Sequence, residues 1–510
     1  MMSKIAEQVR GNEMKRTAYT ENGAKMFKTS GTDLVDLNFK VASYRGKPDN
    51  EIVTDFMKAY AEDPTLAVKW LFYARDIRGG LGERRLFRVI LKQLCNIDPR
   101  FMRNLCFVPD FGRWDDLVYL LASNKAEVRT NMFLGCERIA LDAIKDQLSQ
   151  DIEKCKAGIP VSLLAKWLPS ENASSEETKR MARVMIDRLG FSKKRYRQTL
   201  SMLRKHIDVT EVKMSGNRWG EIDYEKVPSL CNLRNKNAFL RNDEVRRKEF
   251  LGKVTNGEAK INSSVNFPHD IVVQYSMLGY FHMKIAPDDT LEALWKALPY
   301  YGISNTLVVA DGSASMTNKI PGSYAMAIEV ANAFAIYCSE RNSGEFKDRY
   351  ITFSTNPGYV DFSKCNSLLE KLLLARSHCE VSDTDIEKVF MLILQTAVKN
   401  KMPQDEMVKN VLILSDMEFN EAGGRNANAN LFKRISKKYA DAGYRLPKLI
   451  FWNLCSRSNA IPLQENENGV VLVGGFSVHA LKMVMGDKLE PFEILREVLE
   501  SERYKHIYLG

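Results

Sequence analysis

The sequence predicts an α-helical region followed by an α/β domain. Between about residues 50 and 300, apolar residues recur every three or four positions, and short loops separate the runs. After Asn305, short apolar runs alternate with helical patterns, which is the order of a parallel or mostly parallel sheet. We therefore expect residues 1–300 to form the helical region and residues 304–510 to form the α/β domain.

In the helical region, Pro64 marks a helix start, and apolar residues follow at helical spacing through residue 75. The glycine-rich stretch 79–82 interrupts this pattern, which residues 83–94 resume. We interpret this stretch as a turn between helices whose charged flanks pair with Asp76 and Glu83, because it lacks the Lys-Ser/Thr ending of a phosphate-binding P-loop. Further helices are expected at 114–122, 125–149, 162–167, 175–189, 192–206 and 268–282. The run of helices predicts an irregular α-helical repeat array, since no fixed period is visible.

In the second region, five apolar runs have the length and composition of strands. They lie at residues 305–310, 348–354, 409–415, 448–454 and 470–474. Helical patterns lie between and after them, at residues 323–340, 366–376, 385–398, 428–442 and 491–502. The alternation predicts a Rossmann-like sheet covered by helices.

Polar side chains follow two of these strands. Asp311, Ser313 and Ser315 come directly after the first strand, and Asp416 comes after the third. Thr384 lies between them, just before a helical pattern. Loops that follow parallel strands meet at one edge of the sheet, where such folds bind ligands. Oxygen ligands with little total charge suit Mg²⁺ or another divalent cation, so we predict a metal site; the alternative is a set of turn and helix-capping residues.

Charge is concentrated in one segment of the helical region. The whole chain has a net charge of +10, and residues 179–250 carry 19 basic and 9 acidic side chains, which is also a net charge of +10. Such a segment indicates a polyanionic partner. The alternative is a solvated helix face on a scaffold.

Other features exclude several classes of protein. No apolar run reaches the roughly 18 residues of a membrane-spanning helix, and the charged first ten residues do not resemble a signal peptide. The nine cysteines form no CxxC pair, so reduced thiols and a cytoplasmic location are expected. The six histidines suggest no catalytic triad, and we expect no enzymatic activity.

The strand-end residues resemble the metal-ion-dependent adhesion site (MIDAS) of von Willebrand factor A (vWA) domains. In that site the two serines ligate the metal directly, the threonine does so directly or through water, and the distal aspartate usually acts through water. The usual motif has glycine before the second serine, where this chain has Ala314. The resemblance implies a vWA-like domain over residues 304–510.

Motifs in both regions resemble an uncharacterised family that joins a helical region to a vWA-like domain. They include residues 20–24, 74–84, 108–116, 164–170, 196–204 and 451–454. This architecture is similar to that of the Ro/TROVE proteins, in which HEAT-like helical repeats form an RNA-binding ring that a vWA domain closes. The similarity implies that single-stranded RNA ends or structured small RNAs are the partners, and that the basic segment 179–250 is the surface that binds them. The candidate RNA-binding residues are then Lys193, Lys194, Arg195, Tyr196, Arg197, Arg204 and Lys205, with Tyr196 as a base-stacking side chain. The alternative function is a protein adaptor whose metal captures an acidic residue of a partner.

Overall fold

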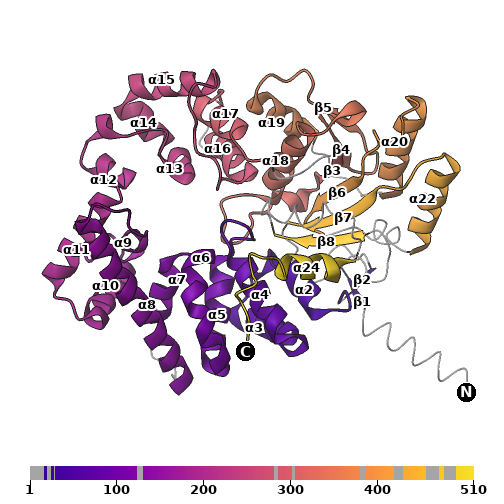
Figure 1. Cartoon of the computed structure of the whole chain (residues 1–510). Helices are drawn as coiled ribbons and strands as arrows, with labels where there is room; N and C mark the ends of the chain where they lie inside the picture. The colour runs from indigo at the N-terminus through magenta and orange to yellow at the C-terminus, as the bar shows by residue number, and fades with distance from the viewer. Residues whose placement is uncertain are drawn as a thin grey trace, which may run out of the picture. The chain divides into compact units, whose positions relative to one another are not determined.

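The structure is a computed structural model that describes residues 17–19, 25–27, 29–122, 130–280, 285–300, 305–378, 386–417, 429–454, 470–475 and 490–509. The chain forms two compact units (Figure 1). The sheet unit contains residues 1–48 and 266–498, and the helical unit contains residues 49–265 and 499–510. The units therefore do not coincide with the expected division into 1–300 and 304–510. Each unit is described by itself below.

The sheet unit is built on six strands in the order β5-β4-β3-β6-β7-β8. The strands are β3 (Thr306–Asp311), β4 (Arg349–Phe353), β5 (Tyr359–Asp361), β6 (Asn410–Ser415), β7 (Lys448–Asn453) and β8 (Val470–Gly474). All pairs are parallel except β4–β5, which is antiparallel. The predicted combination of helices with an α/β sheet is confirmed, whereas the edge strand β5 was not predicted.

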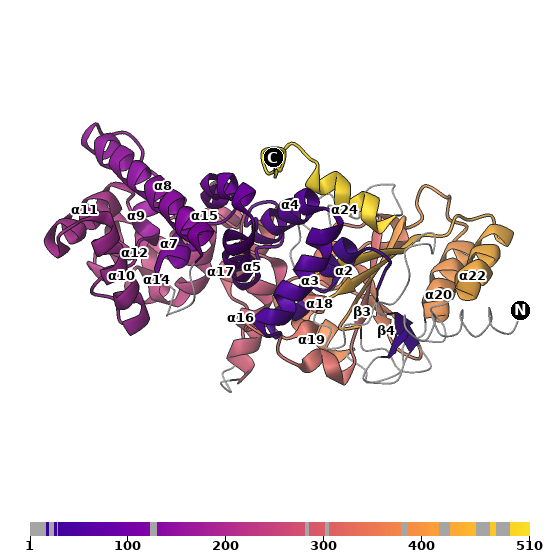
Figure 2. The same ribbon diagram turned by 90° about the horizontal axis from the view of Figure 1, so that it is seen from below.

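Helices cover both faces of this sheet. The helices of this part of the chain are α18 (Ala327–Ser339), α19 (Leu368–Ser377), α20 (Ile386–Lys399), α22 (Ala429–Asp441) and α24 (Pro491–Leu499). Helices α20 and α22 lie side by side (Figures 1 and 2), and both pack on the face that presents Val309 and Ile413. Helix α18 packs on the other face, where the ring centres of Phe334 and of Trp452 on β7 lie 4.7 Å apart. Strands buried on both faces explain the continuous apolar runs of the sequence.

Two segments that we expected in the helical region belong to the sheet unit. Helix α2 (Asp33–Phe39) ends against the last strands, where Asn453 Nδ2 donates to the backbone oxygen of Phe39 at 3.2 Å. A Cβ atom on Gly474 would lie 2.3 Å from that oxygen, so this close approach requires glycine. Helices α16 (Pro268–Tyr280) and α17 (Asp289–Lys296) pack with α18 and α19, and Arg376 of α19 hydrogen-bonds Ser276 of α16.

The helical unit contains no strand within residues 49–122, 130–265 and 499–509. Its α-helices are α3 (Asp49–Glu62), α4 (Pro64–Arg75), α5 (Arg84–Ile97), α6 (Val108–Phe111), α7 (Trp114–Ala122), α8 (Asn131–Lys156), α9 (Leu164–Trp167), α10 (Glu176–Leu189), α11 (Lys193–His206), α12 (Thr210–Ser215), α13 (Ser229–Arg234), α14 (Lys236–Asn242) and α15 (Glu244–Thr255). Successive helices pack through buried apolar side chains, such as Phe72 of α4 against Phe87 of α5. None of the helices in the described part of the chain is long and apolar enough to cross a membrane.

The glycine-rich stretch 79–82 is a tight turn that returns along the end of α4. Leu81 N donates to Tyr73 O at 3.1 Å, and a Cβ atom on Gly80 would lie 1.9 Å from the same oxygen. The arginines beside this turn pair mainly with other residues than we expected. Arg75 Nε lies 2.8 Å from Asp116 Oδ2, and Arg88 Nε lies 2.7 Å from Asp116 Oδ1. The turn is therefore held by a buried ion-pair network, which agrees with a structural role.

Candidate functional site

The candidate metal site begins where β3 ends at Asp311. This carboxylate is buried, and both of its oxygens accept hydrogen bonds. Ser313 N donates to Oδ1 at 2.9 Å, and Ser415 Oγ donates to Oδ2 at 2.6 Å. Burial raises the pKa of Asp311, and the hydrogen bond from Ser415 acts in the opposite direction. A bound cation would favour the charged form of this carboxyl group.

The two serines of the motif lie together. Ser313 Oγ and Ser315 Oγ are 3.0 Å apart, and neither side chain is buried completely. Between them, Ala314 begins the short 3₁₀ helix η4 (Ala314–Thr317) and is exposed. Alanine therefore fits at the position where the usual motif has glycine. The two hydroxyl groups hydrogen-bond each other in the loop that follows β3.

Asp416 follows β6 and is buried, with 3% of its surface exposed. The next residue, Met417, has a positive φ of 63°, so the chain turns sharply after β6. Ser415 Oγ accepts a hydrogen bond of 3.0 Å from Met417 N and donates to Asp311, which joins this turn to the end of β3. The structure thus brings the ends of β3 and β6 together, as predicted from the parallel strand order. Thr384 lies outside the described residues.

Sequence reasoning missed Ser415. The signal for it is its position, because a hydroxyl residue at the last position of β6 lies beside the end of the paired strand β3. A motif marks the metal ligands themselves, whereas a residue that hydrogen-bonds a ligand has no motif of its own.

A short hairpin connects η4 with α18 near this site. Lys319 pairs with Met326, and Ile320 N donates to Ala325 O at 2.9 Å. Ile320 and Ala325 are buried, whereas Tyr324 at the tip is 80% exposed. This ordered hairpin therefore presents an aromatic side chain to solvent next to the serine loop.

The basic candidates lie on α11, and the structure gives them different environments. Lys194, Arg197 and Lys205 are exposed, and none of the three has an ion-pair partner among the described residues. Lys193 Nζ lies 3.0 Å from Glu171, and the Arg195 guanidinium lies 4.3 Å from the ring centre of Phe191. Arg197 also lines an open groove of about 360 Å³ beside residues 170–172. Lys194, Arg197 and Lys205 therefore remain available to a polyanion, and Lys193 and Arg195 are exposed on the same helix.

Two candidates on α11 are corrected by the structure. Tyr196 is 1% exposed, and its hydroxyl donates to Pro169 O at 2.8 Å, so its ring is not available to stack on a base. The guanidinium of Arg204 donates to Ala165 O, Leu168 O and Ser170 Oγ at 2.7–2.8 Å, so it is committed to the loop after α9. The spacing of Tyr196, Leu200 and Leu203 was the signal for a buried helix face.

The remainder of the basic segment is largely neutralised by neighbouring carboxylates. After α11, most acidic side chains pair with a lysine or arginine close in sequence. The pairs include Lys213–Asp208, Arg218–Glu221, Lys226–Asp223, Arg246–Asp243 and Lys248–Glu244. The cations without such partners on α11 therefore carry a large part of the charge surplus of this segment.

Comparisons with known proteins match the chain in two regions that meet between residues 298 and 305. A model described as "Domain of unknown function (DUF2828)" matches residues 20–135 and 137–298. The chain belongs to the DUF2828 family. A second model, "Domain of unknown function (DUF7788)", matches residues 305–506. A protein of Acanthamoeba polyphaga mimivirus named "Uncharacterized protein L728" is 30% identical over 535 residues, which cover 98% of this chain and 90% of that protein.

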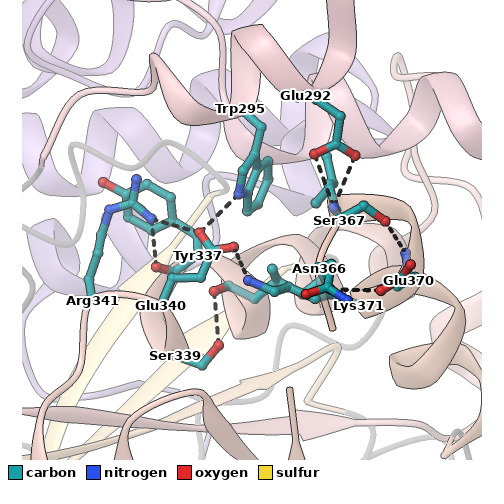
Figure 3. A network of polar contacts seen from close by, with 12 residues as sticks. Glu292, Trp295, Tyr337, Ser339, Glu340, Arg341, Asn366, Ser367, Glu370 and Lys371 are labelled. Atoms are coloured by element: carbon teal, nitrogen blue, oxygen red, sulfur yellow. Dashed lines mark hydrogen bonds and ion pairs between the residues drawn. The ribbon is translucent and has the colours of Figure 1, made fainter. Parts of the chain in front are cut away.

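The region matched by DUF2828 ends at α17, which takes part in a polar network with α18 and α19 (Figure 3). Glu340 accepts hydrogen bonds from Trp295 Nε1 at 2.9 Å and Lys371 Nζ at 2.7 Å. Glu292 accepts from Leu368 N at 3.0 Å and so caps α19. A pocket of about 400 Å³ lies beside this network. Because these polar groups already have partners, we assign the network a role in joining the three helices.

Proposed function

We propose that this DUF2828 protein is an RNA-binding component of a ribonucleoprotein that resembles Ro. It binds small noncoding or misfolded RNA through the basic face of α11 and carries a divalent metal site, preferably for Mg²⁺, at the strand-end edge of a vWA-like domain. The helical unit acts as a HEAT-like scaffold. The protein acts by binding rather than by catalysis.

The observation that carries the RNA proposal is the set of exposed cations on α11. Lys194, Arg197 and Lys205 have no carboxylate partner among the residues that the structure describes, so binding phosphates would break no existing ion pair. Lys193 and Arg195 add positive charge on the same helix. A phosphate that binds here gains Coulomb attraction and releases counterions from the RNA.

The metal proposal is supported by the distance between the two serine hydroxyls. Adjacent ligands of an octahedral Mg²⁺ with bonds of about 2.1 Å lie about 3.0 Å apart. Ser313 Oγ and Ser315 Oγ are separated by 3.0 Å, so they are able to occupy one edge of such an octahedron. Asp311 and Asp416 provide the negative charge, and Thr384 is the fifth candidate by its place in the sequence. A bound cation would supply a Lewis-acidic centre at this edge.

The RNA proposal is tested by filter binding of single-stranded and structured RNAs to the full chain. The variant K194Q/R197Q/K205Q is expected to weaken binding to many sequences alike. It should also reduce the salt dependence by about 0.7 log units per decade for each lost phosphate contact. The matched control is R218Q/K226Q/K248Q, which removes three exposed cations that already have carboxylate partners. Equal affinity of the parent and the α11 variant at low and moderate salt would contradict the proposal.

The second candidate function is a protein adaptor whose metal binds an acidic side chain of its partner. The exposed Tyr324 on the anchored hairpin favours this function, because aromatic side chains often dominate binding at protein interfaces. EDTA and Asp311→Ala would then abolish partner binding. RNA that stays bound after EDTA treatment would favour the first function.

A further inference from the structure

We propose that Ser415 is a positioning residue of the metal centre, because its hydroxyl ties the Asp311 carboxylate to the turn that carries Asp416. This inference rests on the proposed metal site. It adds to the five predicted metal-site residues a side chain that does not itself bind the metal.

Ser415 makes two hydrogen bonds through one buried oxygen. Its Oγ donates to Asp311 Oδ2 at 2.6 Å and accepts from Met417 N at 3.0 Å. Ser415 is fully buried and Asp311 is 4% exposed, so water does not compete readily for these bonds. The hydroxyl hydrogen points to Asp311, because an ionised carboxylate has no hydrogen to donate and the hydroxyl is therefore the donor of this bond.

The position of Ser415 follows from the strand register. Ala310 of β3 pairs with Leu414 of β6, so Asp311 and Ser415 are neighbours at the same edge. On the other side of β3, Asp311 pairs with Phe353, and Ser354 follows at the end of β4. Ser354 is also buried, but its Oγ has no hydrogen-bond partner among the described residues. Of the two buried serines that end the strands beside β3, Ser415 hydrogen-bonds Asp311, whereas Ser354 has no partner among the described residues. Burial beside β3 therefore does not by itself produce this hydrogen bond.

This arrangement fixes the orientation of the carboxylate. Ser313 N holds Oδ1 and Ser415 Oγ holds Oδ2, so the plane of the carboxylate is set from both ends. Through Met417 N, the same hydroxyl holds the turn that places Asp416. Removing the Ser415 hydroxyl would therefore leave both Asp311 and the turn that carries Asp416 less firmly held. Loss of such an outer hydrogen bond typically weakens metal binding by about 10- to 100-fold.

The test is a Mg²⁺ titration by calorimetry on the full chain and three variants. Ser415→Ala should weaken Mg²⁺ binding by about 10- to 100-fold. Ser415→Thr, which keeps the hydroxyl, should bind more tightly than Ser415→Ala. Ser354→Ala is the matched control and should bind as the parent does. Circular dichroism in EDTA verifies that each variant is folded, and the Mn²⁺ electron paramagnetic resonance spectrum should change only for Ser415→Ala.

The possible results separate this inference from the proposed function. If the parent binds Mg²⁺ and Ser415→Ala binds it equally well, the role of Ser415 is wrong and the metal site stands. An equal loss in Ser415→Ala and Ser354→Ala would also overturn the role, because the effect would then belong to any buried hydroxyl at this edge. If the parent itself binds neither Mg²⁺ nor Mn²⁺, the metal site fails and the inference fails with it.

Discussion

The hydroxyl of Tyr504 donates a hydrogen bond of 2.9 Å to the carboxylate of Asp76, which lies 428 residues earlier in the chain. Asp76 is fully buried and also accepts from Arg503 Nη2 at 2.6 Å. The ring of Tyr504 stacks on Phe111 with a centroid distance of 5.4 Å. The last residues of the chain are therefore part of the helical unit, although α24 just before them lies in the sheet unit.

Tyr504→Phe should lower the free energy of unfolding of the helical unit by about 1–3 kcal/mol, because it takes a donor from a buried carboxylate. Deletion of residues 501–510 should cost more, since it also removes Arg503 and the aromatic stack. Thermal or urea unfolding measures both effects. Lys505→Ala is the control, because its ammonium pairs with the exposed Glu502 on the surface of the protein. A deletion variant with the stability of the parent would contradict this role of the C-terminal segment.

Asp116→Ala should destabilise the helical unit by about 3–5 kcal/mol, because it leaves the buried guanidinium of Arg75 without its carboxylate. Arg75 and Asp116 are 2% and 0% exposed, so solvent cannot replace the lost partner. Asp55→Ala breaks the exposed pair with Lys58 and should change stability by less than about 1 kcal/mol. Chemical denaturation measures the free energy of unfolding of both variants. An equally small loss of stability in Asp116→Ala and Asp55→Ala would show that the Arg75–Asp116 ion pair is not needed for stability.

The helical unit should contain an acid-sensitive contact at Asp98. A hydrogen bond from Arg100 lowers the pKa of Asp98 from 3.8 to about 2. A carboxyl group with a lowered pKa in the folded state stabilises the protein above its unfolded pKa, and this stabilisation is lost as the pH falls through about 2. Asp98→Asn should therefore flatten the decrease in stability between about pH 4 and pH 2. Unfolding curves at several pH values measure this effect. The same loss of stability between about pH 4 and pH 2 in the parent and in Asp98→Asn would contradict the role of Asp98.

Tyr196 and Arg204 should affect folding rather than RNA binding. Tyr196→Phe removes the hydrogen bond to Pro169 O and should cost about 1 kcal/mol of stability, while RNA affinity stays unchanged. Arg204→Ala should destabilise the loop after α9, because three acceptors lose their donor. Filter binding and thermal unfolding on the same samples separate the two effects. A stable Tyr196→Leu variant, which lacks the aromatic ring, would restore the stacking hypothesis if it lost RNA affinity strongly while Tyr196→Phe did not.

Much of the fold was predictable because helices and strands leave periodic patterns among neighbouring residues. The alternation after Asn305 predicted β3, β4, β6, β7 and β8, and the spacing of apolar residues predicted α4 and α11. The edge strand β5 was missed because three residues are too few for a pattern. The spacing of Tyr196 with Leu200 and Leu203 indicates a buried helix face, but the basic residues beside Tyr196 suggested that it is exposed.

The sequence by itself determined that a helical region precedes an α/β region, that the candidate metal ligands Asp311 and Asp416 follow strands, and where the charge surplus lies. Only the tertiary structure decided that residues 29–48 pack with the sheet, that Tyr504 binds Asp76, and that Ser415 holds Asp311. These contacts join residues far apart in the chain, so no local periodicity records them. The partner of a buried polar group depends on which elements pack together, and that choice reflects the free energy of the whole fold rather than the preference of any one segment.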